Sequence, residues 1–258
     1  MTIPAFNPQA EIEQICAFIR DYYEKNHLKG AVLGISGGKD SAVAAALFAR
    51  AIGKENVVGL TLPCHSNPQD RTDAELVAQA FGIALMNLDL TGAFDAFTAE
   101  AGKLGLAAPG TDETRNADIN LKPRLRMAAC YYMAALLSAV RGGTYLVAGT
   151  SNACELYVGY FTKGGDSVHD ISVLARFTVD EVIAIGEALG VPDQVIHKAP
   201  SDGLSGMTDE EKMGVKYRDI GDVIQHRPVS QEAYEVIEKL HRGAAHKFHI
   251  PVYERDER

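Results

Sequence analysis

Residues 34–41 read Gly34-Ile35-Ser36-Gly37-Gly38-Lys39-Asp40-Ser41, and they stand between an apolar run at 31–33 and an alanine-rich stretch at 42–51. This order predicts a strand, a tight glycine turn and the start of a helix. Gly37 and Gly38 let the main chain approach a ligand closely, and the first free N–H groups of the helix point into the turn. The segment therefore predicts a phosphate-binding cradle, and we use that name for residues 34–41.

Side chains of the cradle fit a nucleoside triphosphate and its metal ion. Ser36 and Ser41 add hydroxyl donors, and Asp40 offers an oxygen ligand to magnesium. A Walker loop is excluded because Lys39 is followed by Asp40, and the dinucleotide motif G-x-G-x-x-G is absent. The segment resembles the SGGxDS loop of the ATP pyrophosphatases, which cleave ATP to AMP and pyrophosphate while adenylating a substrate. By itself this resemblance implies that ATP is a substrate. It does not identify the molecule that accepts the AMP group.

The composition is that of an ordinary globular protein in a reducing compartment. The chain has 258 residues, 47% apolar and 23% charged, which favours a single domain over residues 1–258. No apolar run reaches the roughly 18 residues of a membrane span, and the N-terminus lacks a signal-peptide pattern. The four cysteines are scattered without a Cys-x-x-Cys pair. We therefore expect a cytoplasmic protein without disulfides or a zinc site and without a membrane partner.

The formal net charge of −9 limits the classes of partner. Nucleic acids are bound through clustered Lys and Arg, so we expect no nucleic-acid partner. The same charge repels ATP at long range, and a helix N-terminus contributes only about 0.3–1 kcal/mol toward holding an anion. Magnesium and a few basic side chains must therefore supply the remaining attraction.

Strand and helix signals alternate along the chain, which predicts an α/β fold with a doubly wound, mostly parallel sheet and helices on both faces. Beyond the cradle, strands are predicted at 56–62, 83–88 and 144–148. Helices are predicted at 8–26, 68–81, 121–141, 178–189, 217–225 and 230–243. A short helix and a surface loop are expected within 91–120, and a basic and aromatic tail at 246–249.

Three local signals refine this outline. Pro123 fits the first turn of the helix at 121–141, where its missing N–H costs little. Thr208-Asp209-Glu210-Glu211 is a capping box that starts a new helix. The Gly- and Ser-rich stretch at 199–206 before it is typical of a lid beside a reactive centre.

Two motifs in the second half of the chain indicate which molecule accepts the AMP group. Gly149-Thr150-Ser151-Asn152-Ala153-Cys154-Glu155 follows the strand at 144–148, at the end where open parallel sheets place ligands. Gly159-Tyr160-Phe161-Thr162-Lys163-Gly164-Gly165-Asp166 comes shortly after. Together they resemble the GTSN(x)2E and GYFTK(x)GD motifs of ammonia-dependent NAD synthetases, which have the Rossmann-like ATP pyrophosphatase fold. The agreement continues in order at 120–127, 198–202, 208–211 and 246–247, so it covers nearly the whole chain.

The resemblance implies roles for individual residues. In the family the cradle, Thr150 and Ser201 contact ATP, and Asp40 and Glu155 bind magnesium. The positions that bind nicotinic acid adenine dinucleotide (deamido-NAD) are matched here by Arg124, Lys163, Asp170, His246 and Lys247. Arg and Lys suit the pyrophosphate and carboxylate of that molecule. Each residue also has a purely structural alternative. Glu155 could interact with the dipole of a helix at its N-terminus, and Thr150 and Ser201 could cap the elements that follow them. The basic residues could be solvated surface charges.

One position departs from the family pattern. Val179 stands where many relatives have a lysine that reaches ATP. Arg176 or Lys39 are the candidates to supply the missing positive charge.

The resemblance also implies a mechanism and an assembly. The nicotinate carboxylate attacks the α-phosphorus of ATP, and ammonia then displaces AMP from the acyl adenylate to give NAD. Asp166 is the candidate to accept a proton from the attacking ammonia. The chain has no room for a glutamine-hydrolysing domain, so we expect it to use free ammonia or ammonia from another protein. Relatives are homodimers, and we expect a homodimer here.

Two other functions share the cradle. A tRNA-thiolating relative would use cysteines after the second strand, but Cys64 has no second cysteine at short spacing, and the acidic charge disfavours tRNA. A non-catalytic ATP-binding protein of the same fold would bind ATP without releasing pyrophosphate. The presence of both Asp40 and Glu155 argues against that second alternative.

Overall fold

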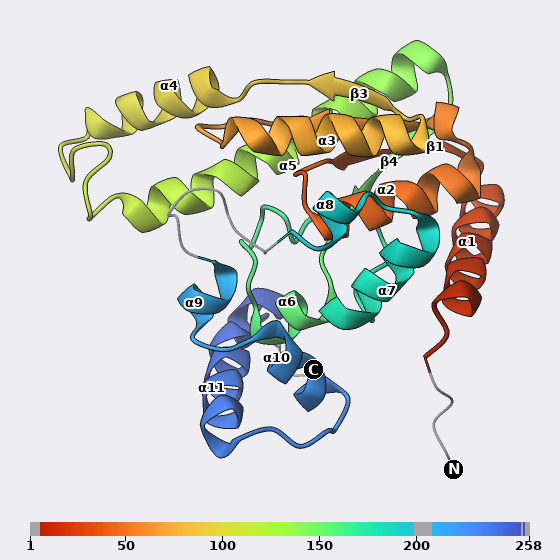
Figure 1. The fold of residues 1–258 in the computed structure, drawn as a ribbon. Coiled ribbons are helices and arrows are strands. Elements are labelled where there is room, and N and C mark those ends of the chain that lie inside the picture. The colour runs from red at the N-terminus through yellow and green to blue at the C-terminus, as the bar shows by residue number, and fades with distance from the viewer. Residues whose placement is uncertain (1–5, 199–207, 254, 256–258) are drawn as a thin grey trace.

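A five-stranded, all-parallel sheet forms the centre of the computed structural model, which describes residues 6–198, 208–253 and 255 (Figure 1). The strand order is β3-β2-β1-β4-β5. Their bounds are β1 (Leu28–Gly34), β2 (Val57–Thr61), β3 (Ala84–Asn87), β4 (Thr144–Gly149) and β5 (Ile171–Ser172). The predicted doubly wound parallel sheet is confirmed. β1 lies in its middle, between β2 and β4, so the cradle follows a central strand.

Helices cover both faces of the sheet, as predicted. Successive residues of a strand point to opposite faces of the sheet, so Leu33 of β1 joins one buried cluster and Val32 joins another. The first face carries α1 (Pro8–Lys25), α2 (Lys39–Ile52), α3 (Pro68–Phe81), α7 (Val179–Leu189) and α8 (Asp193–Ile196). The second face carries α4 (Thr91–Gly102) and α5 (Arg115–Arg141). A short 3-10 helix, η1 (Lys54–Asn56), precedes β2.

A third group of helices stands at one end of the molecule (Figure 1). It contains α6 (Ala153–Val158), α9 (Asp209–Met213), α10 (Tyr217–Ile224) and α11 (Gln231–Phe248). Ile220 and Ile237 are fully buried between these helices. The predicted capping box is present at α9, where the Thr208 hydroxyl accepts a hydrogen bond from the Glu211 N–H at 3.2 Å. No helix within the described ranges is long and apolar enough to span a membrane.

Two helix boundaries differ from the sequence predictions. α5 begins at Arg115 rather than at 121, so Pro123 lies inside the helix and not in its first turn. Polar contacts, which leave no apolar pattern, stabilise the extra turns; the Thr114 hydroxyl donates to Asp118 Oδ2 at 2.7 Å. α11 continues to Phe248, so the expected tail at 246–249 is largely the last turn of a helix. All four cysteines are buried, and none of them forms a disulfide bond.

Candidate active site

The cradle has the predicted strand, turn and helix geometry. Gly37 has φ of 76°, and a Cβ atom there would lie 2.6 Å from the carbonyl oxygen of Asp70 in α3. The Ser36 and Ser41 hydroxyl oxygens lie 3.1 Å apart, and Ser41 Oγ donates to the Gly38 carbonyl at 3.0 Å. These hydroxyl groups therefore shape the turn, a role that the sequence did not reveal. Gly38 caps α2 without any side-chain hydrogen bond, which leaves the first N–H groups of the helix for a phosphate.

Two acidic residues from distant parts of the sequence meet beside the cradle. β4 pairs with β1, and the chain after β4 brings Asn152 to Asp40, where Asn152 Nδ2 donates to Asp40 Oδ1 at 3.0 Å. Asn152 also caps α6: its Oδ1 accepts from the Glu155 N–H at 3.0 Å, and Glu155 Oε2 accepts from the Asn152 N–H at 3.1 Å. Loss of surrounding water, followed by the charge of Asp40, raises the pKa of Glu155 well above its usual range. The two carboxyl groups therefore repel each other.

This pair fits the magnesium ion that the family resemblance implies. Mg²⁺ is held by one or two carboxylates together with substrate phosphates and water, and a cation relieves the repulsion between Asp40 and Glu155. No group of three or more metal-ligating side chains occurs among the described residues, so phosphate and water oxygens would complete the coordination. The helix-cap alternative for Glu155 is also confirmed, and its bond to Asn152 involves Oε2. A cap and a metal ligand are compatible in one carboxylate because it has two oxygens.

The basic residues predicted to bind the second substrate gather where α5, the segment 159–166 and α11 meet. Arg124 Nε and Nη2 donate to the Lys163 carbonyl at 3.3 and 3.2 Å. Lys163 Nζ donates to the His246 carbonyl at 2.7 Å. The structure thus brings Arg124, Lys163 and His246 together through main-chain carbonyl groups, with Arg124 and Lys163 exposed to solvent.

Lys247 has a more internal position than its neighbours. Its Nζ donates to the carbonyls of Gly159 and Phe161 at 2.7 and 2.6 Å and lies 5.1 Å from the centre of the Phe161 ring. Burial lowers the pKa of this ammonium group. Ala244 packs so closely on Gly159 that a Cβ atom on Gly159 would lie 2.2 Å from the Ala244 Cβ. Lys247 therefore ties α11 to the start of the segment 159–166.

Each of the two remaining acidic candidates accepts a hydrogen bond from a main-chain N–H group. Asp166 Oδ1 accepts from the Thr162 N–H at 2.7 Å, and surrounding protein atoms raise the pKa of Asp166. Its charge also acts to raise the pKa of Glu155, which places the two acids in one electrostatic environment. Asp170 accepts from the Tyr131 hydroxyl at 3.0 Å and from the Val147 N–H at 2.8 Å. Asp170 therefore links the loop before β5 to α5 through one oxygen and to β4 through the other.

The remaining residues singled out in the sequence lie in different surroundings. Thr150 is half-buried just after β4, close in sequence to Asn152. Ser201 and the expected lid at 199–206 lie outside the described residues. Val179 is buried in an apolar cluster with Cys154 and Tyr217, whereas Arg176 is exposed.

The sequence did not single out an ion-paired group that supports the cradle. Lys198 Nζ lies 3.0 Å from Asp70 Oδ1 and 2.7 Å from Asp73 Oδ2, and Asp73 is buried. Burial works to raise the pKa of Asp73, but hydrogen bonds from Lys198 and Gln69 outweigh it and hold the pKa below its usual range. Gly37 packs against this first part of α3. The pairing joins residues more than a hundred positions apart, so no local pattern indicates it.

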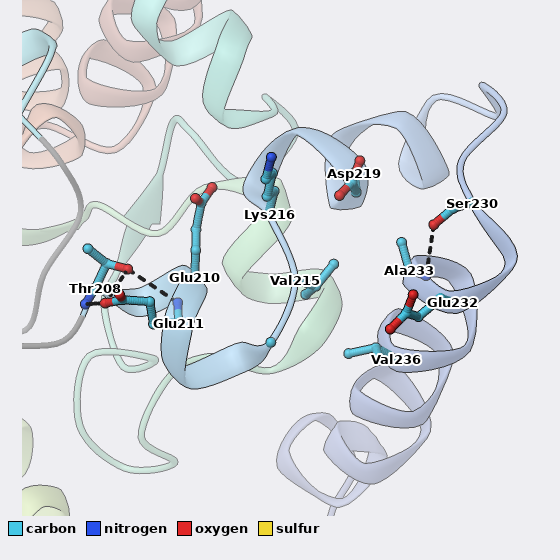
Figure 2. A pocket seen from close by; sticks show the side chains of 11 residues that line it. Thr208, Glu210, Glu211, Val215, Lys216, Asp219, Ser230, Glu232, Ala233 and Val236 are labelled. Atoms are coloured by element: carbon cyan, nitrogen blue, oxygen red, sulfur yellow. Dashed lines mark hydrogen bonds between the residues drawn. The ribbon is translucent and has the colours of Figure 1, made fainter.

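A pocket of about 430 Å³ lies apart from these residues, between the α9–α10 segment and α11 (Figure 2). Figure 2 shows acidic side chains from both sides of it, including Glu210, Asp219 and Glu232. Glu210 serves the fold, because its Oε1 accepts from the Tyr217 N–H at 2.8 Å. Of the residues predicted to bind ATP, magnesium or the second substrate, none that the structure describes lines this pocket.

Comparison with known proteins identifies the family of this chain. The family model for NAD synthase matches residues 11–251. An NH3-dependent NAD(+) synthetase of Carboxydothermus hydrogenoformans is 38% identical over 248 residues, covering 95% of this chain and 97% of the relative. One from Methanocaldococcus jannaschii is 39% identical over 216 residues, covering 83% and 79%. The structure of NMN synthetase from Francisella tularensis matches with a TM-score of 0.86 at 33% identity, covering 96% of this chain and 99% of that one.

A second solved structure, the NH3-dependent NAD synthetase from Campylobacter jejuni, matches with a TM-score of 0.76 at 26% identity. It covers 97% of this chain and 100% of its own. The two structures therefore share the fold of this chain over nearly its whole length. The chain belongs to the NAD synthase family.

Proposed function

We propose that this chain is a ligase that amidates nicotinic acid adenine dinucleotide with ammonia and ATP, giving NAD, AMP and pyrophosphate. The observation that carries the proposal is the hydrogen bond between Asn152 and Asp40. It places two acidic side chains, Asp40 and Glu155, at the open N-terminus of α2, where a magnesium-bound triphosphate requires oxygen ligands and N–H donors.

The first step is transfer of AMP to the nicotinate carboxylate. The cradle N–H groups hold the phosphates of ATP, and a carboxylate oxygen attacks the α-phosphorus while the bond to pyrophosphate breaks. Magnesium held by Asp40 and Glu155 would neutralise charge on the departing pyrophosphate. Arg124 and Lys163 carry positive charge at the surface and suit the anionic groups of the second substrate.

The second step is attack of ammonia on the acyl adenylate. The nitrogen must lose a proton as the carbon–nitrogen bond forms and AMP leaves with the electron pair of the broken bond. Asp166 suits the proton acceptor, because its raised pKa makes it a stronger base than an ordinary aspartate. The hydrogen bond from the Thr162 N–H fixes one of its oxygens.

The test is an amidation assay with purified protein, ATP, magnesium and ammonium. We expect NAD, AMP and pyrophosphate in equal amounts, measured by chromatography. Nicotinic acid mononucleotide is the second acceptor to compare, because the Francisella tularensis neighbour is described as NMN synthetase. We expect a higher kcat/KM for the dinucleotide. A higher value for the mononucleotide would reassign the acceptor, and ATP binding without AMP formation would contradict the proposal.

We also propose that two copies of the chain associate through α5. Tyr132, Leu136 and Val140 follow one another at four-residue spacing and are 67%, 43% and 75% exposed. Residues 127–140 contain no charged side chain, which is unusual for a helix with an exposed face. A second copy supplies an equivalent apolar surface, as a two-fold symmetric interface requires.

Tyr132→Glu is expected to convert the dimer to a monomer, because it puts a charge at one end of this apolar row, where the tyrosine would be buried against the second copy. Light scattering coupled to size-exclusion chromatography measures the mass. Tyr234→Glu is the matched control, since Tyr234 is a comparably exposed tyrosine (45%) on α11. A Tyr132→Glu protein that remains dimeric, or a monomeric wild type, would contradict the α5 interface.

A further inference from the structure

The imidazole ring of His169 rests on the last residue of β4. A Cβ atom on Gly149 would lie 2.5 Å from Cγ and Cδ2 of this ring and 2.6 Å from its Nδ1. Nearly equal distances to three ring atoms mean that the face of the ring lies over Gly149. Gly149 does not have a positive φ, so close contact with the ring, and not the backbone angle, requires a glycine at this position.

The main chain beside His169 is fixed by its neighbour. The Asp170 N–H donates to the Val147 carbonyl at 2.9 Å, and the Asp170 carboxylate accepts from the Val147 N–H and the Tyr131 hydroxyl. Val147 belongs to the buried cluster under α5, so Gly149, two residues later in the same strand, faces the same side of the sheet. The ring of His169 is therefore held on the α5 side, at the carboxyl end of β4.

The two nitrogen atoms of this half-buried ring have different surroundings. Nδ1 is buried and has no hydrogen-bond partner among the residues that the structure describes. Nε2 has no partner among them either, but it is not buried, so it faces solvent. A buried N–H group without an acceptor is rarer than a buried acceptor without a donor. We therefore assign the proton of the neutral ring to Nε2, which makes His169 a hydrogen-bond donor toward solvent.

This donor lies between the residues to which the resemblance gives the two substrates. Gly149, under the ring, precedes Thr150, which is expected to contact ATP, and His169 precedes Asp170, which is expected to bind deamido-NAD. Because the nicotinate carboxylate reacts with the α-phosphorus of ATP, the carboxylate must lie where these two sets of residues meet. The motif GYFTK(x)GD ends at Asp166, so it gives no role to His169.

We propose that the Nε2–H group of His169 donates a hydrogen bond to the carboxylate on the pyridine ring of the second substrate. His169 then favours the acid, which reacts, over the amide, which is the product. A hydrogen bond to a charged carboxylate is stronger than one to the neutral oxygen of a carboxamide. The ring orients the carboxylate and keeps its own proton throughout. The inference rests on the proposed function and deepens it, because it names a residue that selects the acceptor.

The test compares His169→Ala with the wild type by titration calorimetry, using deamido-NAD and NAD as separate ligands. We expect the Kd for deamido-NAD to rise by about 30-fold and that for NAD by about threefold, because hydrogen bonds to charged groups contribute more than those between neutral groups. His169→Gln keeps an N–H donor at the end of the side chain and should restore most of the affinity for deamido-NAD. His197→Ala is the matched control, since His197 is an exposed histidine beside Glu187 and should leave both Kd values unchanged.

Gly149→Ala tests the seat of the ring independently. The added Cβ must displace the ring, so the affinity for deamido-NAD should fall about as much as in His169→Ala. In a protein that already carries His169→Ala, the same Cβ meets no ring, and Gly149→Ala should cause little further loss. An equal loss from Gly149→Ala in both backgrounds would contradict a role for the contact between Gly149 and the ring.

Unchanged binding of deamido-NAD by His169→Ala would overturn the proposal. Equal weakening of deamido-NAD and NAD would also overturn it, since His169 would then act through the fold or through a part that both molecules share. These measurements need no turnover. A wild type that binds deamido-NAD without converting it to NAD would refute the proposed reaction and leave the role of His169 to be decided by the binding data. A wild type that does not bind deamido-NAD would overturn both proposals.

Discussion

Asp40→Asn is expected to lower the rate of AMP and pyrophosphate formation by about 100- to 1,000-fold, because it removes the negative charge that we propose as a magnesium ligand. Metal neutralisation of a transferring phosphoryl group contributes several kcal/mol, and about 1.4 kcal/mol corresponds to a factor of ten in rate. Asparagine keeps the shape of the side chain and an oxygen that accepts from Asn152 Nδ2. The expected loss therefore reports charge rather than packing.

The fold is expected to tolerate this change. Asp40 contributes to the raised pKa of Glu155, so removing its charge lowers that pKa and relieves the repulsion between the two groups. Thermal unfolding without ligand should change little, while the magnesium concentration required for half-maximal activity rises. Asp180→Asn is the control, an exposed acid in the first turn of α7 that no step of the reaction uses. Wild-type pyrophosphate release by Asp40→Asn would remove Asp40 from the metal site.

Local signals explain why parts of the fold were predictable. α3 has the predicted bounds because its start and end are set by neighbouring residues in the sequence. Asn67 accepts from the Gln69 N–H at 3.0 Å, Pro68 occupies the first turn, and Gly82 adopts a left-handed conformation with φ of 66°. Each of these residue types is preferred at that position for a stereochemical reason. The cradle was predictable on the same basis.

Elements stabilised by distant contacts were not predictable. β5 has only two residues, and it pairs with the end of β4 at Ala148 and Gly149. The sequence predicts that the last helix ends at residue 243 and that a tail follows, whereas α11 continues to Phe248. In the structure Lys247 donates to two carbonyls more than 80 positions away. Carbonyl groups occur at every residue, so a side chain that binds them leaves no sequence pattern.

In the site too, local motifs were predictable from the sequence and contacts between distant residues were not. Motif order identified Asp40 and Glu155 as partners, but their connection through Asn152 depends on β4 lying beside β1. Strand order in a sheet is a tertiary property that alternation of helices and strands does not specify. The sequence also showed that Val179 cannot bind a phosphate. The two candidate replacements have different surroundings in the structure, since Arg176 is exposed while Lys39 lies beside Asp40.

Gly37→Ala is expected to raise the KM for ATP by about 100-fold, the scale of loss that follows a displacement of about 1 Å in a binding site. The left-handed backbone at Gly37, with φ of 76°, costs a non-glycine residue about 1–2 kcal/mol. The added Cβ would also lie 2.6 Å from the Asp70 carbonyl oxygen and 2.9 Å from the Asp73 Cβ. These atoms cannot simply rotate away, because one is main chain and the Asp73 side chain is held by Lys198. The turn itself must therefore move.

Gly38→Ala separates this steric effect from a general loss of glycine. Gly38 has φ of −101°, which alanine adopts readily, and its nearest contact would be the Ser36 hydroxyl at 3.3 Å. We therefore expect a much smaller rise in the KM for ATP from Gly38→Ala. Urea unfolding should show Gly37→Ala to be less stable by at least about 1 kcal/mol, from the backbone strain alone. If both variants raised the KM equally, close contact between the cradle and α3 would not be the cause, and flexibility of the turn would have to explain the requirement for glycine.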